Sequence, residues 1–286
     1  MSSVLRLGYA PPLDWEEMMR YLAARVIQGV EYVSGGAYRR TITIDGDPAV
    51  LEIAPGGDDW LALRIDPPHS DGMAQVVKHA RHIFNLDADL DAANRQLAVD
   101  PLLEPLIAAR PGLRVPGTWD AYELGVRAII GQQVSVAGAS TIAARLVQRH
   151  GTPVPDTERY GLSHTFPSPA TLARAELSGI GLTSARTAAI QNFAAAVRDG
   201  AVDLDRATPS EELADSLVAI AGVGHWTANY IALRMGVADA FPSTDLGLRR
   251  ALERLSSNVT TPAVLAQRAE RWRPWRAQAA IHLWLS

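Results

Sequence analysis

The chain has 286 residues, 48% hydrophobic and 20% charged, with a formal net charge of −4 at pH 7, a balance typical of a globular protein with one large or two modest cores. It contains no cysteine, which excludes disulfides, a thiolate nucleophile, Cys-type zinc sites and Cys-ligated iron–sulfur clusters. No segment approaches the roughly 20 apolar residues of a membrane span, and the start lacks a basic stretch followed by an apolar one, so we expect a cytoplasmic protein with no membrane partner.

The N-terminal third is predicted to mix helices and strands. Residues 14–33 carry apolar side chains at helical spacing behind Asp14, a suitable N-cap, and residues 71–84 show the same spacing. Between them, alternating polar and apolar residues separated by turn residues predict a meander of antiparallel strands. The predicted strands are residues 41–44, 49–54 and 60–65. We therefore expect a small α+β domain over residues 1–100, an antiparallel sheet with helices.

Every predicted element after about residue 86 is helical. A capping signal precedes a long helical pattern over 121–149, which is interrupted at 131–133. Loops that contain Pro and Gly separate the further predicted helices, which are residues 169–177, 183–198, 210–221, 225–236, 246–256, 262–271 and 275–285. An all-α region over 101–286 is thus predicted to follow the α+β domain, with the boundary within 95–116.

Gly222-Val223-Gly224 joins two of these helices by a tight turn. Glycines allow positive φ and close approach of backbone N–H groups to a bulky anion. The unpaired N–H groups of the helix that begins at His225 face the same anion. Such a hairpin can hold one DNA phosphate without reading a base. On these residues alone, however, an ordinary αα-hairpin with a glycine C-cap is the better interpretation.

Asp245 lies in the loop that opens a later helix. An aspartate at this position is most often a helix cap worth about 0.5–2 kcal/mol. The same carboxylate stays ionised near a helix N-terminus, where it can stabilise developing positive charge or take a proton from water. On its position alone, the helix cap is the better interpretation.

Several large aromatic side chains gather near these motifs. Trp226 follows the hairpin directly, Tyr230 comes one turn later, and Trp272, Trp275 and Trp284 crowd the C-terminal segment. Large aromatics are usually core residues. Beside a phosphate-binding turn they also suit stacking on a base, worth about 1–3 kcal/mol each, and they attract a cationic base further.

Charge is distributed unevenly along the chain. Residues 1–100 hold 9 basic against 15 acidic residues, whereas residues 246–286 hold seven arginines against two glutamates. A basic segment on an acidic protein indicates phosphate contact or, more commonly, a solvated arginine-rich helix face. We expect arginines of this segment, Arg249 among them, to contact a DNA backbone.

Taken together, these motifs resemble the helix–hairpin–helix (HhH-GPD) DNA glycosylase superfamily, most closely the 3-methyladenine DNA glycosylase II (AlkA) type. The resemblance spans nearly the whole chain. It rests on an aspartate nineteen residues after Trp226 and on segments Leu22–Arg25, Ala108–Arg114, Ala121–Val136, Gly222–Tyr230, Arg271–Arg276 and His282–Trp284. It implies an all-α region built of two helical subdomains that flank an active-site cleft.

The resemblance implies hydrolysis of the N-glycosidic bond of alkylated bases, of the 3-methyladenine and 7-methylguanine type, flipped from duplex DNA. Asp245 matches the family's catalytic aspartate. The matching base-pocket positions are Trp226, Tyr230, Trp284, Gln132 and, at the pocket's edge, Tyr21. The matching DNA-binding positions are Gly222, Val223, Gly224, His225 and Thr227 of the hairpin, together with Gln133. The carbonyls of Val218, Ile220 and Val223 match a monovalent-cation site for Na⁺ or K⁺, and no other cofactor is required.

Two positions depart from the family pattern. Gln133 stands where an apolar wedge is common, and Leu246, after Asp245, replaces a frequent aromatic. Bifunctional members attack the sugar with a lysine just after the hairpin, but Trp226 holds that place and the single lysine, Lys78, lies far away in the sequence. We therefore expect a monofunctional enzyme that leaves an abasic site, a monomer that acts on double-stranded DNA of a bacterial nucleoid.

Two alternatives remain. A glycosylase for oxidised or deaminated bases needs more hydrogen-bond donors in its pocket than the identified residues offer. A non-catalytic module that senses DNA damage needs the hairpin and the arginines but no anionic group facing a pocket. The combination of Asp245 with Trp226 and Trp284 disfavours the second alternative.

Overall fold

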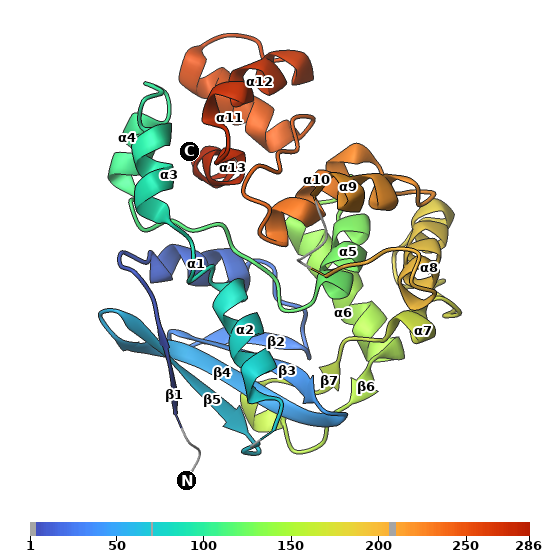
Figure 1. Ribbon diagram of the computed structural model, residues 1–286. Helices are drawn as coiled ribbons and strands as arrows, with labels where there is room; N and C mark the ends of the chain where they lie inside the picture. The colour runs from blue at the N-terminus through green and yellow to red at the C-terminus, as the bar shows by residue number, and fades with distance from the viewer. Residues whose placement is uncertain (1–3, 70, 206–209) are drawn as a thin grey trace.

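An antiparallel five-stranded sheet forms the N-terminal part of the computed structural model, which describes residues 4–69, 71–205 and 210–286 (Figure 1). The strand order is β1-β5-β4-β3-β2, and every neighbouring pair is antiparallel. The strands are β1 (Leu5–Gly8), β2 (Glu31–Ser34), β3 (Ala37–Ile44), β4 (Asp47–Gly57) and β5 (Trp60–Asp66). The predicted antiparallel sheet is confirmed, although the sequence pattern identified only the three central strands.

The helix predicted over 14–33 is wrong in its second half. Helix α1 (Trp15–Ala23) begins at the Asp14 cap as expected but ends after nine residues. The chain then passes Gly29, with φ +92°, and enters strand β2. Gly35 and Gly36, both at positive φ, form the turn that pairs β2 with β3. Pairing with a neighbouring strand therefore outweighs the helical spacing of the apolar residues there.

Helices α1 and α2 (Met73–Ile83) cover one face of this sheet (Figure 1). Their buried side chains, among them Met18 and Ile83, join the strand residues in one continuous core. Helices α3 (Leu90–Leu97) and α4 (Glu104–Ala109) follow and lie beside the C-terminal helices instead (Figure 1). Between α3 and α4, Asp100 accepts a hydrogen bond from the indole of Trp272 at 2.9 Å. The segment after the sheet is thus fastened to the C-terminal end of the chain.

The rest of the chain is helical, as predicted, except for a two-stranded ladder of β6 (Thr152–Pro153) and β7 (His164–Thr165). Two short 3-10 helices cover Glu158–Tyr160 and Glu270–Trp272. The α-helices are α5 (Ala121–Ile130), α6 (Val136–His150), α7 (Pro169–Leu172), α8 (Ser184–Arg198), α9 (Ser210–Val218), α10 (His225–Arg234), α11 (Leu246–Ser256), α12 (Pro262–Ala269) and α13 (Arg276–Trp284).

Local capping chemistry explains where several helices begin. Asp120 accepts a hydrogen bond from the backbone of Glu123 at the start of α5, and Ser135 does the same for Gly138 at the start of α6. Between these helices the chain turns at Gln133, which adopts φ +57°. The interruption predicted at 131–133 is therefore confirmed.

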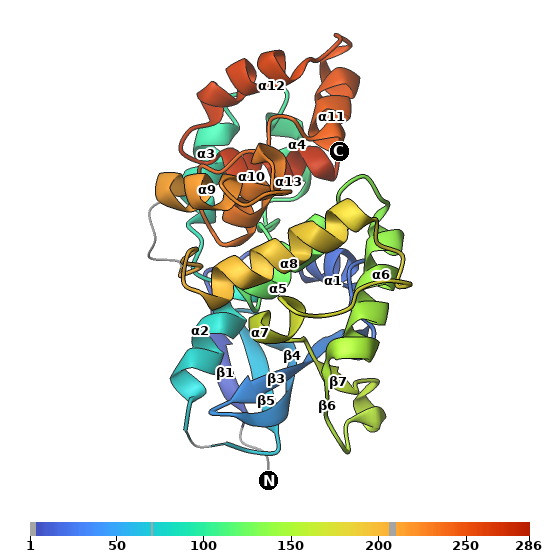
Figure 2. The same ribbon diagram turned by 90° about the vertical axis from the view of Figure 1, so that its right-hand side faces the viewer.

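The helices form two groups (Figures 1 and 2). Helices α5 to α8 form one group, which the β6–β7 ladder joins to strand β3 of the sheet, and α8 crosses in front of α5 in Figure 2. Helices α11 to α13 form the second group with α3 and α4, and α10 lies between the groups. No helix in the described ranges combines the length and apolar character needed to cross a bilayer.

Candidate active site

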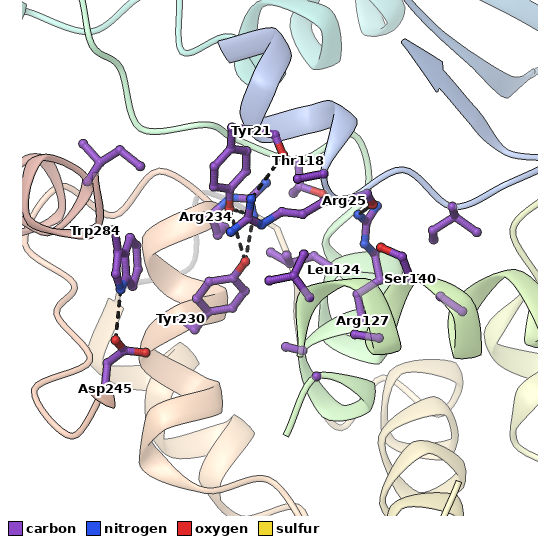
Figure 3. A pocket seen from close by; sticks show the side chains of 18 of the residues that line it. Tyr21, Arg25, Thr118, Leu124, Arg127, Ser140, Tyr230, Arg234, Asp245 and Trp284 are labelled. Carbon is purple, nitrogen blue, oxygen red and sulfur yellow. Dashed lines mark hydrogen bonds between the residues drawn. The ribbon is translucent and has the colours of Figure 1, made fainter. Parts of the chain in front are cut away.

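A cavity of about 490 Å³ lies where α1, α5, α6, α10 and α13 converge, next to the start of α11. Asp245 and Trp284 lie at one end, Arg25, Arg127 and Ser140 at the other, and tyrosines between them (Figure 3). Small-molecule sites commonly occupy cavities of about 300–1,000 Å³. The cavity therefore has the size of a ligand site, and it opens between the two helical groups.

The Asp245 carboxylate is held by three hydrogen-bond donors. One oxygen accepts from the indole Nε1 of Trp226 at 2.8 Å. The other accepts from the indole Nε1 of Trp284 at 2.9 Å and from the backbone N–H of Leu248 at 2.8 Å. Asp245 is thus the N-cap of α11 and a half-buried anion on the cavity wall at once. The helix cap expected from its sequence position is confirmed, and its catalytic role stays a prediction.

The aromatic side chains predicted for the pocket are brought together here. The rings of Trp226 and Tyr230 stack with centroids 5.4 Å apart and planes 9° apart. Trp284 meets Tyr230 edge to face at 6.3 Å. Each of these rings lines the cavity, and each is only half-buried. The wall beside Asp245 thus offers aromatic surface to a flat ligand.

A cluster of phenols and guanidinium groups occupies the middle of the cavity (Figure 3). Arg234 Nη1 donates to the hydroxyl of Tyr21 at 2.7 Å and to that of Tyr230 at 2.9 Å. The Arg25 guanidinium lies 3.7 Å from the centre of the Tyr21 ring. Burial raises the pKa of Tyr230, but Arg234 and Arg25 outweigh that effect and lower it to about 8. The expectation of a pocket poor in hydrogen-bond donors is therefore wrong.

A buried network of ion pairs connects the sheet domain to the wall of this cavity. Arg127 lines the cavity, and its Nη1 donates to Glu31 of β2 at 2.9 Å and to Glu123 of α5 at 3.1 Å. Arg40 of β3 donates to Glu123 at 2.7 Å. Burial raises the pKa of Glu31, but Arg127 and Arg40 outweigh burial and lower the net value. Because both acids are buried, loss of either would leave an uncompensated charge beneath the cavity wall.

The hairpin at 222–224 is a tight turn against α8. Gly222 adopts φ +94°, and a Cβ added there would come within 2.4 Å of the Ala189 side chain. Gly224 is exposed, and a Cβ added there would meet nothing within 4 Å. As the N-cap of α10, Gly224 has no side chain with which to cap the first turn. The N-terminal N–H groups of α10 beside the exposed His225 are thus left open toward solvent.

Some predicted site residues have other surroundings. Gln132 does not line the cavity; its amide donates to the Gly222 carbonyl and to the Thr227 hydroxyl, both at 3.1 Å. Thr227 is buried, so its side chain does not reach a DNA backbone, contrary to the expectation. Val223 is also buried, and its N–H donates a hydrogen bond to the Ile220 carbonyl at 3.0 Å. These contacts fasten the hairpin to the end of α5.

The two residues that depart from the family pattern are both exposed. Gln133 is exposed between Gly131 and Val134, two residues that line the cavity. Leu246, the other departure from the family pattern, is 52% exposed and lies directly after Asp245. Both side chains thus sit at the surface beside the cavity.

Most C-terminal arginines are committed within the protein, which corrects the expectation that this segment as a whole contacts DNA. Arg268 pairs with Asp100, and both Arg273 and Arg276 pair with Asp239. The predicted DNA-binding residue Arg249 is half-buried, and its Nε donates to the Thr260 carbonyl at 2.9 Å. Three of the seven arginines in this segment form ion pairs within the protein, and Arg249 and Arg254 donate to backbone carbonyls.

Sequence reasoning missed the basic end of the cavity. Arg25 follows Tyr21 of α1 by four residues, directly after Ala24, the C-cap of that helix, and Arg234 follows Tyr230 by four residues on α10. Residues four apart lie on the same helix face. The repeated Tyr-x-x-x-Arg spacing was therefore the available signal. Among the described residues, no group of three or more His, Cys, Asp or Glu is arranged to hold a metal ion.

Two family models match the chain. The AlkA N-terminal domain matches residues 4–120, and the HhH-GPD superfamily of base excision DNA repair proteins matches residues 126–277. The chain is 34% identical over 283 residues to DNA-3-methyladenine glycosylase 2 of Escherichia coli, covering 97% of this chain and 95% of that protein.

The chain is also 39% identical over 282 residues to a probable bifunctional transcriptional activator/DNA repair enzyme AlkA of Mycobacterium tuberculosis, covering 98% of this chain. It spans about half of that relative, 56% of its length. A solved 3-methyladenine DNA glycosylase of Archaeoglobus fulgidus superposes with a TM-score of 0.85 at 23% identity, covering 98% of this chain and 97% of that one. This likeness shows the fold.

Proposed function

This chain belongs to the HhH-GPD superfamily of base excision DNA repair proteins and carries an AlkA N-terminal domain, and we propose that it is a monofunctional DNA glycosylase. Its substrates are alkylated bases of the 3-methyladenine and 7-methylguanine type, flipped from duplex DNA. The observation that carries the proposal is the Asp245 carboxylate, held by two indole N–H groups on the wall of a cavity lined with aromatic rings.

The chemistry follows from this arrangement. Flipping the damaged nucleotide costs a few kcal/mol, least for a weakly paired lesion. N3- or N7-alkylated purines carry positive charge, stack on the electron-rich rings of Trp226 and Tyr230, and are good leaving groups. As the bond from the sugar carbon to the base nitrogen breaks, the base leaves with the electron pair and the sugar approaches an oxocarbenium ion. Asp245 stabilises that charge and accepts a proton from the water that forms the new carbon–oxygen bond.

The hairpin supplies the anchor on the DNA backbone. Open N–H groups at the start of α10 and the positive end of the helix suit a phosphate, and the missing side chain of Gly224 leaves room for it. Gln133, exposed beside the cavity, occupies the place from which a side chain fills the gap left by the flipped base.

The same site supports a hydrolase without strand-cutting activity. Trp226 holds the position just after the hairpin where a lysine would attack the sugar. The single lysine, Lys78, lies on α2 and does not line the cavity. The product is therefore an abasic site in an intact strand.

A structural Na⁺ or K⁺ at the hairpin is part of the proposal. The carbonyls of Val218 and Val223 accept no hydrogen bond from the described residues, so both are available, and Ile220 uses only part of its accepting capacity on the Val223 N–H. Carbonyl oxygens suit a hard monovalent cation. Such an ion would add positive charge where the phosphate approaches, and no other cofactor is required.

Other features of the proposal follow from the substrate. Double-stranded chromosomal DNA places the enzyme in the bacterial cytoplasm on the nucleoid, and one flipped base per event requires only a monomer. The donors around Tyr21 and Arg25 favour a second candidate, a glycosylase for neutral oxidised or deaminated bases. A non-catalytic damage sensor is disfavoured because it gives the cavity-facing Asp245 no role.

The test is base release from methylated duplex DNA. The protein is incubated in excess over DNA treated with dimethyl sulfate, and released bases and abasic sites are both counted. We expect methylated purines to appear with an equal number of abasic sites, and strands to break only after alkali. Release of no methylated base would overturn the proposed reaction, and strand breaks without alkali would overturn its monofunctional character.

A further inference from the structure

We infer that Arg25, together with the hydroxyl pair of Tyr21 and Tyr230, reads the edge of the flipped purine that lies opposite its glycosidic bond. These groups favour an oxygen at purine position 6 over an amine. The inference rests on the proposed function and adds to it a discrimination between two purine classes in the same cavity.

Arg25 differs from the other arginines of the cavity because its guanidinium forms no ion pair and contacts few groups of the described protein. Among the arginines lining the cavity, Arg20 and Arg127 pair with carboxylates. Arg234 donates to two backbone carbonyls and to both tyrosine hydroxyls. Within the described part of the chain, the Arg25 guanidinium makes one hydrogen bond, from Nη1 to the Tyr21 carbonyl at 3.2 Å. A guanidinium has five N–H donors and no acceptor, so most of its donors remain unused.

The geometry of Arg25 turns these unused donors into a recognition surface. Its guanidinium lies over the Tyr21 ring at 3.7 Å from the centroid, a cation–π contact that fixes one face of the plane. The Arg25 backbone is fixed as well, because its carbonyl accepts a hydrogen bond from Arg127. A planar guanidinium held in this way presents a rigid fork of donors at its edge.

The tyrosine hydroxyls must also act as donors toward a ligand. A guanidinium has hydrogen-bond donors but no acceptor, so the hydroxyl oxygens of Tyr21 and Tyr230 both accept from Arg234, at 2.7 and 2.9 Å. The two oxygens lie 3.4 Å apart, so at most one hydroxyl proton points at the other oxygen. Neither hydroxyl has a further acceptor within the described ranges. At least one O–H therefore points into the cavity, where a ligand must offer an acceptor.

The position of Asp245 decides which edge of the base meets these donors. The bond to be hydrolysed has to lie beside Asp245, at one end of the cavity, whereas the Arg25 guanidinium lies in the middle of the cavity, against the Tyr21 ring and away from Asp245 (Figure 3). In a purine, the ring edge opposite the glycosidic nitrogen carries the position 6 substituent. An oxygen there accepts from Arg25 and a tyrosine hydroxyl, whereas an amine presents further donors and leaves those donors unpaired.

The test compares two lesions within one DNA sample. Duplex DNA treated with dimethyl sulfate carries 7-methylguanine, with an oxygen at position 6, and 3-methyladenine, with an amine there. Both bases are cationic in DNA, so a change in cavity charge acts on both. With the enzyme in excess, each released base is followed by chromatography. We expect Arg25→Met to lower the rate of 7-methylguanine release about tenfold relative to that of 3-methyladenine.

Further variants keep the test decisive. Tyr21→Phe removes one hydroxyl and is expected to move the ratio in the same direction, and Arg25→Lys, which keeps the charge but not the fork, is expected to restore it partly. Arg95→Gln, an exposed residue on α3 outside the cavity, removes the same charge and should leave the ratio unchanged. Thermal unfolding of each variant shows whether it remains folded.

The outcomes separate the two proposals. If Arg25→Met and Tyr21→Phe slow both releases equally, or slow 3-methyladenine more, the reading of position 6 is refuted while the glycosylase stands. If the unaltered protein releases neither base, the proposed function fails and this inference fails with it.

Discussion

Replacing Trp284 by phenylalanine tests whether the indole N–H groups hold Asp245 in its working position. The substitution keeps an aromatic ring against Tyr230 but removes the donor 2.9 Å from the carboxylate. Only the Trp226 indole and the Leu248 backbone would then hold Asp245. A hydrogen bond to a charged group is worth about 1.5–3 kcal/mol, which corresponds to a fall of about 10- to 150-fold in rate if the whole bond is needed in the transition state.

The assay is release of methylated purine with the enzyme in excess, which isolates the chemical step from product release. Trp15→Phe is the matched control, because the Trp15 indole also donates one hydrogen bond, to the Gly36 carbonyl at 3.1 Å in the sheet domain. We expect that variant to keep its rate. A folded Trp284→Phe protein with an unchanged rate would refute the positioning role of the indole.

Three further predictions concern the hairpin and two titrating groups. Gly224→Ala should keep the unfolding temperature but weaken DNA binding, because the added Cβ meets only open space, where a phosphate would approach. Gly222→Ala should lower the unfolding temperature, because Gly222 has positive φ and its added Cβ would meet Ala189. Equal effects of the two variants on the unfolding temperature would contradict this. A pH titration of tyrosinate absorbance should show one group with a pKa near 8, absent in Tyr230→Phe and shifted upward in Arg234→Met. Because the pKa of Tyr230 is lower in the folded state than in the unfolded one, Tyr230 adds to the free energy of unfolding as pH rises from about 8 to 10. A first tyrosine titration only near pH 10 would contradict this. Burial, and to a smaller extent Arg110, lower the pKa of His282 to about 4. Between pH 6.5 and 4 the unfolded chain therefore binds a proton at His282 that the folded chain does not, and the free energy of unfolding falls by about 3 kcal/mol. Urea unfolding of His282→Gln should show a smaller fall over this range, and a pH profile identical to that of the unaltered protein would contradict the lowered pKa.

The features that sequence predicted well are those that local chemistry decides. The turn needs a glycine at Gly222, which adopts φ +94°, and the Asp245 cap follows from its place before a helix. The break between α5 and α6 is marked by Gly131 and by the Ser135 cap. In each case the determining contacts lie within a few residues of one another.

The features that sequence predicted poorly depend on contacts between distant segments. Residues 24–33 have helical spacing, yet β2 forms there because β3 offers a pairing partner across the Gly35–Gly36 turn. The arginine excess near the C-terminus looked available to DNA, but Asp100 and Asp239 neutralise much of it after folding. The cluster of tyrosines and arginines in the middle of the cavity likewise exists only because α1 and α10 meet there. Spacing along the chain does not reveal such pairings.

The most direct test of the account replaces Asp245 by asparagine. The variant keeps the shape of the side chain and one accepting oxygen, but it removes the negative charge and replaces the other oxygen, which accepts an indole N–H in the unaltered protein, with an amide nitrogen. We expect binding of methylated duplex to persist while release of methylated purine with the enzyme in excess falls by at least about 100-fold. Release at close to the original rate would show that the anion at the cavity wall does not drive the reaction.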